Sequence, residues 1–148
     1  MTTVAASTAD RAFKSVVTLT GNAGATLSFK GTSLTGGVST PAVVVVPADN
    51  FCIGPFAPET FPGKIVVCQR GGDPGRVQKG FNVLQGGAVG MILYHTNAAT
   101  TDQETDNHFL PATHIQFSEG QQLLAFLAAN PGATATSQLA CSIHSRAT

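Results

Sequence analysis

The sequence has few charged side chains and no run of charge of one sign. Only 11% of its 148 residues are Asp, Glu, Lys or Arg, against roughly 25% in an average domain. The eight basic residues balance the eight acidic ones. Without a basic stripe, we expect neither nucleic acid nor an anionic membrane surface as a partner. The longest apolar run, residues 42–46, is too short to span a bilayer.

Motifs of catalysis and metal binding are also missing. The sequence contains no G-x-S-x-G, no H-E-x-x-H and no S-x-x-K. It lacks the paired cysteines of a zinc site. We therefore expect no catalytic residue, no metal and no cofactor in this chain.

The segment GKIVVCQRGGDPGRVQKG, residues 63–80, contains neither of the two glycine spacings that define phosphate-binding loops, G-x-G-x-x-G and G-x-x-x-x-G-K-[ST]. It predicts a turn followed by a helix over residues 74–85. Asp73 is the expected N-cap and Pro74 the first helical residue. Helical spacing places Val77, Phe81 and Leu84 on the inward face.

The length fits a single domain, residues 1–148, of which residues 1–12 are expected to form a flexible tail. A second helix is expected to open with a capping box at Ser118 and to stop at Asn130. The helix over residues 74–85 lies between two of the predicted strands, which indicates a right-handed β-α-β unit with parallel strands. Strands are predicted at residues 15–19, 25–29, 42–46, 64–69, 90–95, 111–117 and 133–139.

A polar loop at residues 96–109 gathers acidic side chains, with histidines on both sides. The cluster can be read as a metal site or as a solvated loop that works as a lid or spacer. Its D-x-E-x-D spacing lacks the glycine and the distant glutamate of an EF-hand, which favours the solvated loop. The residues concerned are Asp102, Glu104, Asp106, His95, His108 and His114.

Cysteine spacing leaves two interpretations open. Cys52 and Cys68 flank a proline-rich loop, so they form either a disulfide or a pair of buried thiols. Two compartments also stay open, the cytosol or a segment of a longer secreted protein. The low charge and high threonine content favour the second.

Three stretches point to a known family: FPGKIVVCQRG, RVQKGFNVLQGGAVGMILYH and DNHFLPATHI. In order and spacing, residues 51–140 resemble the protease-associated (PA) domain inserted into secreted subtilisin-like serine proteases. The resemblance implies a mixed α+β fold, a small open β-barrel or sandwich of about seven strands flanked by two helices. It also implies a Cys52–Cys68 disulfide and offers no counterpart for Cys141.

The same resemblance implies a non-catalytic, extracellular protein-interaction module. Its parent would be a subtilisin-like serine endopeptidase, in which it contributes to substrate selection or to access to the protease site. Its partner would be a protein or peptide substrate, or the catalytic domain of the parent. Two alternatives stay open: a metal-dependent hydrolase using the His/Asp loop, and a free-standing sorting or polysaccharide-associated module.

A docking edge is expected where the two parallel strands end, by analogy with the crevices of open α/β sheets. Arg70 supplies a fork of donors for a peptide carbonyl or carboxylate, and the glycines let another backbone approach. The competing interpretation is that Arg70 pairs with a loop carboxylate and the glycines serve the turn. The expected edge consists of Arg70, Gly71, Gly72, Asp73, His95, Thr96 and Asn97.

Overall fold

A computed structural model describes residues 11–100 and 105–143 of the chain. That part contains seven strands, two α-helices and one short 3-10 turn. The elements are β1 (Arg11–Thr20), η1 (Asn22–Gly24), β2 (Thr26–Thr32), β3 (Ala42–Val45), β4 (Ile65–Gln69), α1 (Arg76–Gln85), β5 (Gly90–Tyr94), β6 (Ala112–Ile115), α2 (Phe117–Ala129) and β7 (Thr134–Ile143).

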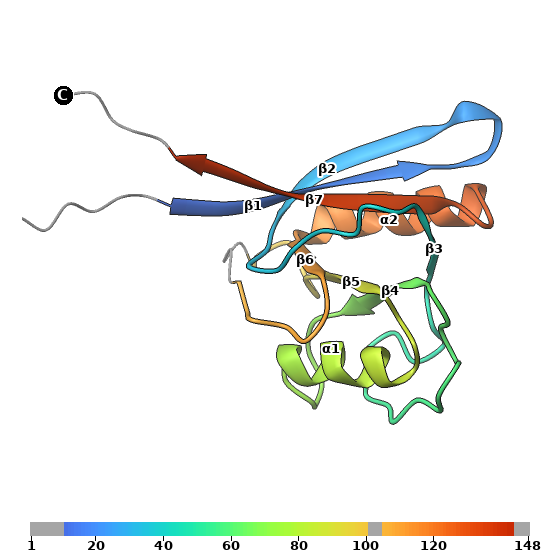
Figure 1. Ribbon diagram of the computed structural model, residues 1–148, viewed down its shortest axis with the longest axis vertical. Helices are drawn as coiled ribbons and strands as arrows, with labels where there is room; N and C mark the ends of the chain where they lie inside the picture. The colour runs from blue at the N-terminus through green and yellow to red at the C-terminus, as the bar shows by residue number, and fades with distance from the viewer. Residues whose placement is uncertain (1–10, 101–104, 144–148) are drawn as a thin grey trace, which may run out of the picture.

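The strands close into a barrel in the order β1-β2-β6-β5-β4-β3-β7. The four strands from β3 to β6 pair in parallel, and the remaining pairs are antiparallel. β1 and β7 run side by side along their whole length, so that Arg11 pairs with Ile143 (Figure 1). The mixed fold expected from the sequence is therefore confirmed, including the parallel β-α-β unit.

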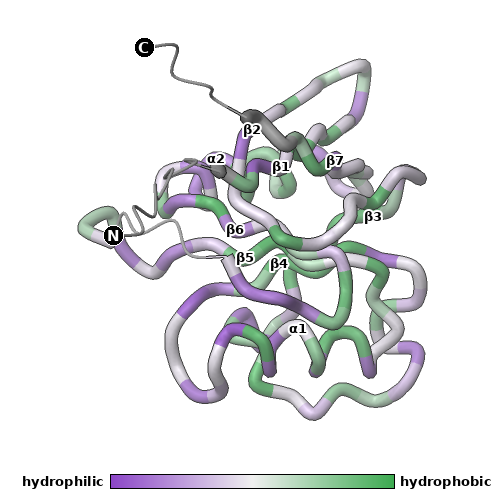
Figure 2. The backbone as a smooth tube through the Cα atoms, turned by 60° about the vertical axis from the view of Figure 1, so that its left-hand side comes forward, coloured by the Kyte–Doolittle hydropathy of each residue, from purple (hydrophilic) through white to green (hydrophobic). Residues whose placement is uncertain are grey.

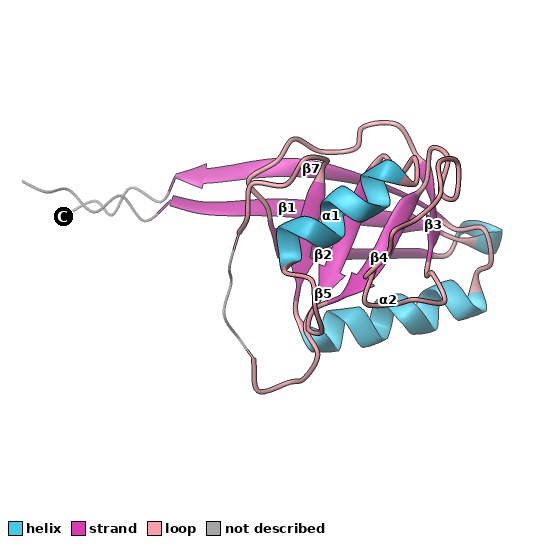
Figure 3. Ribbon diagram, turned by 90° about the horizontal axis from the view of Figure 1, so that it is seen from below, coloured by secondary structure: helices cyan, strands magenta, loops and turns pink. Residues whose placement is uncertain are grey.

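Alternation along the parallel strands divides the interior into two cores, because successive side chains of a strand point to opposite faces. One set lies in the core that α2 covers with Leu123: Ile65, Val67, Ile92, Tyr94 and Ile115. The other set lies in the core beneath α1: Val66, Cys68, Met91, Leu93 and Ala112. The two helices thus lie on different sides of the molecule (Figure 3). Buried on both faces, β4 and β5 are hydrophobic along most of their length (Figure 2).

The first helix differs from the sequence prediction at its start and in its buried face. It begins at Arg76 with Gly75 as N-cap, so the predicted roles of Asp73 and Pro74 were wrong. Its buried residues are Lys79, Gly80, Asn82 and Val83, whereas the predicted Leu84 is 38% exposed. The polar side chains of this face, Lys79 and Asn82, donate hydrogen bonds to backbone carbonyls of the loop after β3. Hydrophobic spacing does not reveal that these carbonyls need donors.

The second helix also begins earlier than predicted. Its capping box joins Gln116 and Glu119, and the backbone N–H of Gln116 donates to Glu119 Oε2 at 2.9 Å. Ser118 is exposed and is not the cap. The predicted end at Asn130 is confirmed. Within the described residues, neither helix combines the length and apolar character needed to cross a membrane.

Candidate functional site

The register of β4 and β5 brings the two predicted loops together. Gln69 and Tyr94 are the last pair of this ladder, so Arg70 and His95 follow side by side. The backbone N–H of Arg70 donates to the Tyr94 carbonyl at 2.8 Å. Nη1 of Arg70 lies 3.2 Å from Nδ1 of His95. His95 is only 6% exposed although it directly follows the end of β5.

The turn after Arg70 needs its glycines. Gly71 and Gly72 have φ of 102° and 66°, in the left-handed region that disfavours side chains. A Cβ on Gly71 would also lie 3.0 Å from Cγ2 of Thr96. The backbone conformation and the close approach of Thr96 therefore both require glycine in this turn.

A cleft of about 640 Å³ lies over this edge, and we call it the Arg70 cleft. Four predicted residues line it: Arg70, Gly71, Gly72 and Thr96. Residues that the sequence analysis did not assign to this edge complete the wall: Pro74, Gly75, Arg76, Val77, Gln78, Lys79, Thr100 and Asp106. Half of them belong to the first turn of α1, which follows shortly after the glycine turn.

The other three predicted edge residues lie outside the Arg70 cleft. Asp73 is exposed on the turn before α1. Asn97 closes its own loop, because its Oδ1 accepts hydrogen bonds from the backbone N–H groups of Ala99 and Thr100 at 3.0 and 3.1 Å. His95 instead borders a smaller cavity of about 60 Å³ that His114 also lines.

Two cations of α1 shape the wall of the Arg70 cleft. Nη2 of Arg76 donates to Oδ1 of Asp106 at 3.0 Å, and Nε donates to Oδ2. These hydrogen bonds hold the pKa of Asp106 below its ordinary value, although burial acts in the opposite direction. Nζ of Lys79 donates to the carbonyl of Phe51. Burial lowers the pKa of Lys79, while the carboxylates of Asp49 and Asp73 act to raise it.

Asp106 also joins two histidines in a cluster on the barrel side of the cleft. His108 and His114 are 7% and 8% exposed, and their Nε2 atoms lie 2.8 Å apart. Nε2 of His114 lies 4.0 Å from Oδ2 of Asp106. Burial lowers the pKa of His108, which the Asp106 carboxylate partly opposes. For these residues the solvated-loop interpretation was wrong, whereas Asp102 and Glu104 lie outside the described residues.

The disulfide between Cys52 and Cys68 is present, with both sulfurs fully buried. It fixes the loop after β3 against β4, and α1 holds the same loop from its other side. Nδ2 of Asn82 donates to the carbonyls of Cys52 and Ile53 at 3.1 and 2.6 Å. The side chain of Cys141 lies outside those that the structure describes.

The barrel, with a cross-linked loop under α1 and a cleft at the strand ends, defines a small mixed α+β domain. The family pattern described as PA domain matches residues 38–123. Sequence relatives point to the same kind of protein. The chain is 36% identical over 147 residues to the subtilisin-like protease SBT1.7 of Arabidopsis thaliana, and 36% identical over 155 residues to SBT1.3 of the same plant. The chain belongs to the PA domain family, in the form found in subtilisin-like proteases.

These alignments cover 92% and 94% of the chain but only 19% of each relative. The chain thus spans about a fifth of the length of these proteases. Their complete sequences contain much more than the part matched here.

Solved structures share the fold at lower sequence identity. An aminopeptidase from Aneurinibacillus sp. strain AM-1 matches with a TM-score of 0.57 and 24% identity, over 90% of this chain and 34% of that one. The subtilisin-like protease Apa1 from the Antarctic psychrotroph Pseudoalteromonas sp. AS-11 matches with a TM-score of 0.52 and 16% identity, again over 90% and 34%. The same barrel therefore occurs in peptidases of different kinds.

Proposed function

We propose that this chain is a non-catalytic docking module of an extracellular subtilisin-like protease, and that its Arg70 cleft binds an extended peptide segment. The segment belongs to a protein substrate or to the catalytic domain of the parent, so binding contributes to substrate selection or to access to the protease site. Family membership and the disulfide, which is typical of oxidising compartments, support the extracellular assignment.

The observation that carries the proposal is the position of Arg70 beside an exposed glycine turn in a cleft of about 640 Å³. Gly71 and Gly72 present backbone without side chains, which allows a second backbone to approach. The half-buried guanidinium of Arg70 already has one edge on His95. Its planar fork suits a peptide carbonyl or carboxylate. Arg76 is paired with Asp106 and the Lys79 amine is bound to the Phe51 carbonyl, so the preference of the cleft for acidic side chains rests on Arg70.

The two alternatives drawn from the sequence gain less support. The relatives matched over nine tenths of the chain carry the name of subtilisin-like proteases, which favours a module within such an enzyme over a free-standing one. A metal-dependent hydrolase would need the histidine cluster to accept a substrate. The two imidazoles are instead buried and face each other.

The test is a binding measurement on the purified chain. A positional library of extended peptides is screened by fluorescence polarisation, and the tightest peptide is titrated against wild type, Arg70→Ala and Gln138→Ala. We expect Arg70→Ala to weaken binding by about tenfold to a hundredfold, the usual range for a hydrogen bond with a charged group. Its melting temperature should stay at the wild-type value, and exposed Gln138 on β7 should be replaceable without effect.

Three outcomes contradict the proposal. The first is an Arg70→Ala variant that leaves every peptide interaction unchanged, and the second is an Arg70→Ala variant that fails to fold. The third is a set of peptide-induced NMR shifts that map to residues away from the Arg70 cleft. Turnover of the library by the chain alone would contradict the non-catalytic assignment.

A further inference from the structure

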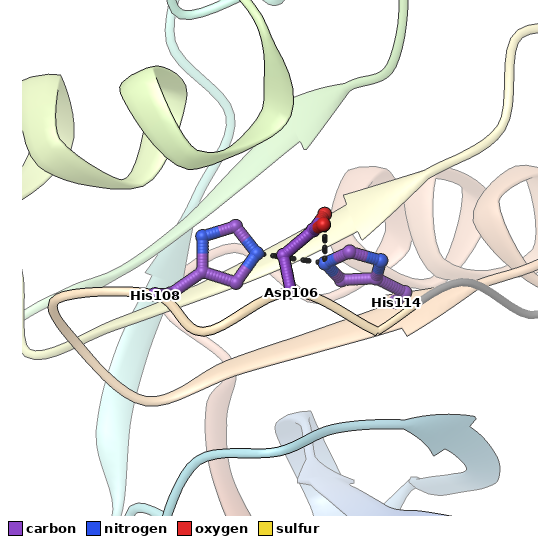
Figure 4. Close-up of side chains that lie close together, drawn as sticks. All are labelled: Asp106, His108 and His114. Atoms are coloured by element: carbon purple, nitrogen blue, oxygen red, sulfur yellow. Dashed lines mark hydrogen bonds and ion pairs between the residues drawn. The ribbon is translucent and has the colours of Figure 1, made fainter.

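Asp106, His108 and His114 come together because the chain before β6 folds back along it. Asp106 and His108 lie in the segment before the strand, and His114 lies inside the strand. One ligand atom of each residue lies within 4.8 Å of the other two. Figure 4 shows the two imidazole rings turned toward each other with the Asp106 carboxylate beside them.

The spacing of these atoms is close to that of a tetrahedral metal site. Zinc binds imidazole nitrogen and carboxylate oxygen at about 2.0–2.2 Å, which places neighbouring ligand atoms about 3.3 Å apart. Here the two Nε2 atoms are 2.8 Å apart, and Nε2 of His114 is 4.0 Å from Oδ2 of Asp106. These distances lie on either side of the tetrahedral value. All three ligand atoms lie within 4.8 Å of one another, so modest side-chain shifts would bring them into position.

Two neighbours from α1 hold the cluster in place. Arg76 donates two hydrogen bonds to Asp106. A carboxylate has about four lone-pair sites, so further sites stay available to an ion. An outer hydrogen bond of this kind orients metal-binding carboxylates in proteins. Gly80 leaves space for the imidazole ring of His108, because a Cβ on Gly80 would lie 2.8 Å from its Nδ1.

The ligand types select the ion. Two imidazoles and one carboxylate suit zinc and similar transition metals. Calcium needs six to eight oxygen ligands, and magnesium prefers carboxylates and water. A neutral imidazole is the form that binds a metal ion.

We propose that Asp106, His108 and His114 form a binding site for one divalent transition-metal ion of the zinc type. The ion joins the segment before β6 to the strand and leaves one coordination position for water. Because Asp106 also lines the Arg70 cleft, the ion fixes one wall of it. The two proposals are tested by separate measurements, and either can fail without the other.

The first experiment uses zinc chloride and the untagged chain after dialysis against a chelator. Calorimetry should give one ion per chain, and the melting temperature should rise with zinc concentration, since an ion that binds the folded state stabilises it. Cobalt(II) should give the intense visible absorption of a four-coordinate site. In NMR, zinc should shift the ring signals of His108 and His114 and leave those of His95 in place.

The variants His108→Gln and His114→Gln remove one imidazole each at similar volume. Each should weaken zinc binding by more than the roughly tenfold to hundredfold loss expected for an outer-shell change. The matched control is His95→Gln, which removes a histidine that is also buried but contacts Arg70 instead. Circular dichroism checks that each variant is folded.

The proposal is overturned if stoichiometric zinc leaves both the melting temperature and the histidine signals of wild type unchanged. The cluster is then a hydrogen-bonded histidine pair without metal. Full zinc affinity in the His108→Gln/His114→Gln double variant would also overturn it, because the ion would then bind elsewhere. The NMR measurement needs no variant, so the test remains decisive even if a substitution prevents folding.

Discussion

At the scale of single residues, the least expected feature is the buried amine of Lys79. Its side chain is 1% exposed and lies on the inner face of α1, where Nζ donates to the Phe51 carbonyl. The ammonium also lies 5.5 Å from the centre of the Phe51 ring. The position could not be predicted from helical spacing, which assigns lysine to the solvent. The backbone of the disulfide loop needs donors, and that need is visible only once the loop and the helix are placed together.

The buried lysine makes stability depend on pH in the alkaline range. Burial lowers the pKa of Lys79 below 10.5, so between its folded pKa and 10.5 the unfolded chain binds more protons than the folded one. The free energy of unfolding should therefore rise with pH across that window. Lys79→Met keeps most of the side-chain volume and should abolish this rise, as measured by urea unfolding at several pH values.

The comparison with Lys79→Met is needed because Tyr94 acts in the opposite direction. Burial raises the pKa of Tyr94 above 10.0, so its ionisation favours the unfolded chain as the solution becomes more alkaline. Both proteins contain Tyr94, and its contribution cancels in the difference between them. Identical slopes for wild type and Lys79→Met would mean that the amine is not desolvated in solution.

At the scale of elements, the sequence predicted the β-α-β unit well because its hydrophobic pattern changes from strand to helix and back. That unit also explains why Arg70 and His95 could be predicted to be neighbours, since parallel strands end at one edge. The histidine cluster was named from the sequence as a possible metal site, but its acidic loop lacks a metal-binding motif and the solvated-loop interpretation was preferred. One signal against that interpretation was present: His114 lies inside the predicted strand of residues 111–117, and the four residues of β6 are all buried.

The contact between α2 and β5 depends on one glycine. A Cβ on Gly120 would lie 2.6–2.7 Å from three atoms of the Tyr94 side chain, closer than real contacts allow. Alanine favours a helix over glycine by about 1 kcal/mol, so propensity alone predicts that Gly120→Ala stabilises the protein. We expect the clash to dominate and Gly120→Ala to cost about 1–3 kcal/mol, the usual range for overpacking.

Ser118→Ala on the same helix is the matched control. Ser118 is exposed and is not the N-cap, so its replacement should change the free energy of unfolding by less than about 0.5 kcal/mol. If Ser118 were the cap, its loss would cost about 1 kcal/mol. Thermal or urea unfolding of the two variants decides both points, and a stabilised Gly120→Ala would show that Tyr94 can move aside.

At the scale of the whole molecule, the barrel and the α1 side are two packed units that share one sheet. The barrel closes through β7, which pairs with β1 at the opposite end of the chain and also with β3. Periodicity identifies such strands but not their partners, because pairing between distant segments depends on the fold as a whole. The α1 side is local in sequence, and the Cys52–Cys68 disulfide lies in its core.

The two-unit arrangement predicts where loss of the disulfide acts. Replacing both Cys52 and Cys68 by serine removes a link across a sequence separation of 16 residues. It should lower the free energy of unfolding by about 3 kcal/mol in the chain-entropy model. The loop after β3 then loses its covalent link to β4, and the carbonyls that bind Lys79 and Asn82 become mobile.

Hydrogen exchange should therefore accelerate most in α1 and in the loop after β3, through local opening. The amides of β1, β2 and β7 should accelerate only as far as the lower global stability requires, because their ladder does not involve the α1 core. Uniform acceleration through barrel and helix alike would show instead that the two cores unfold as one unit.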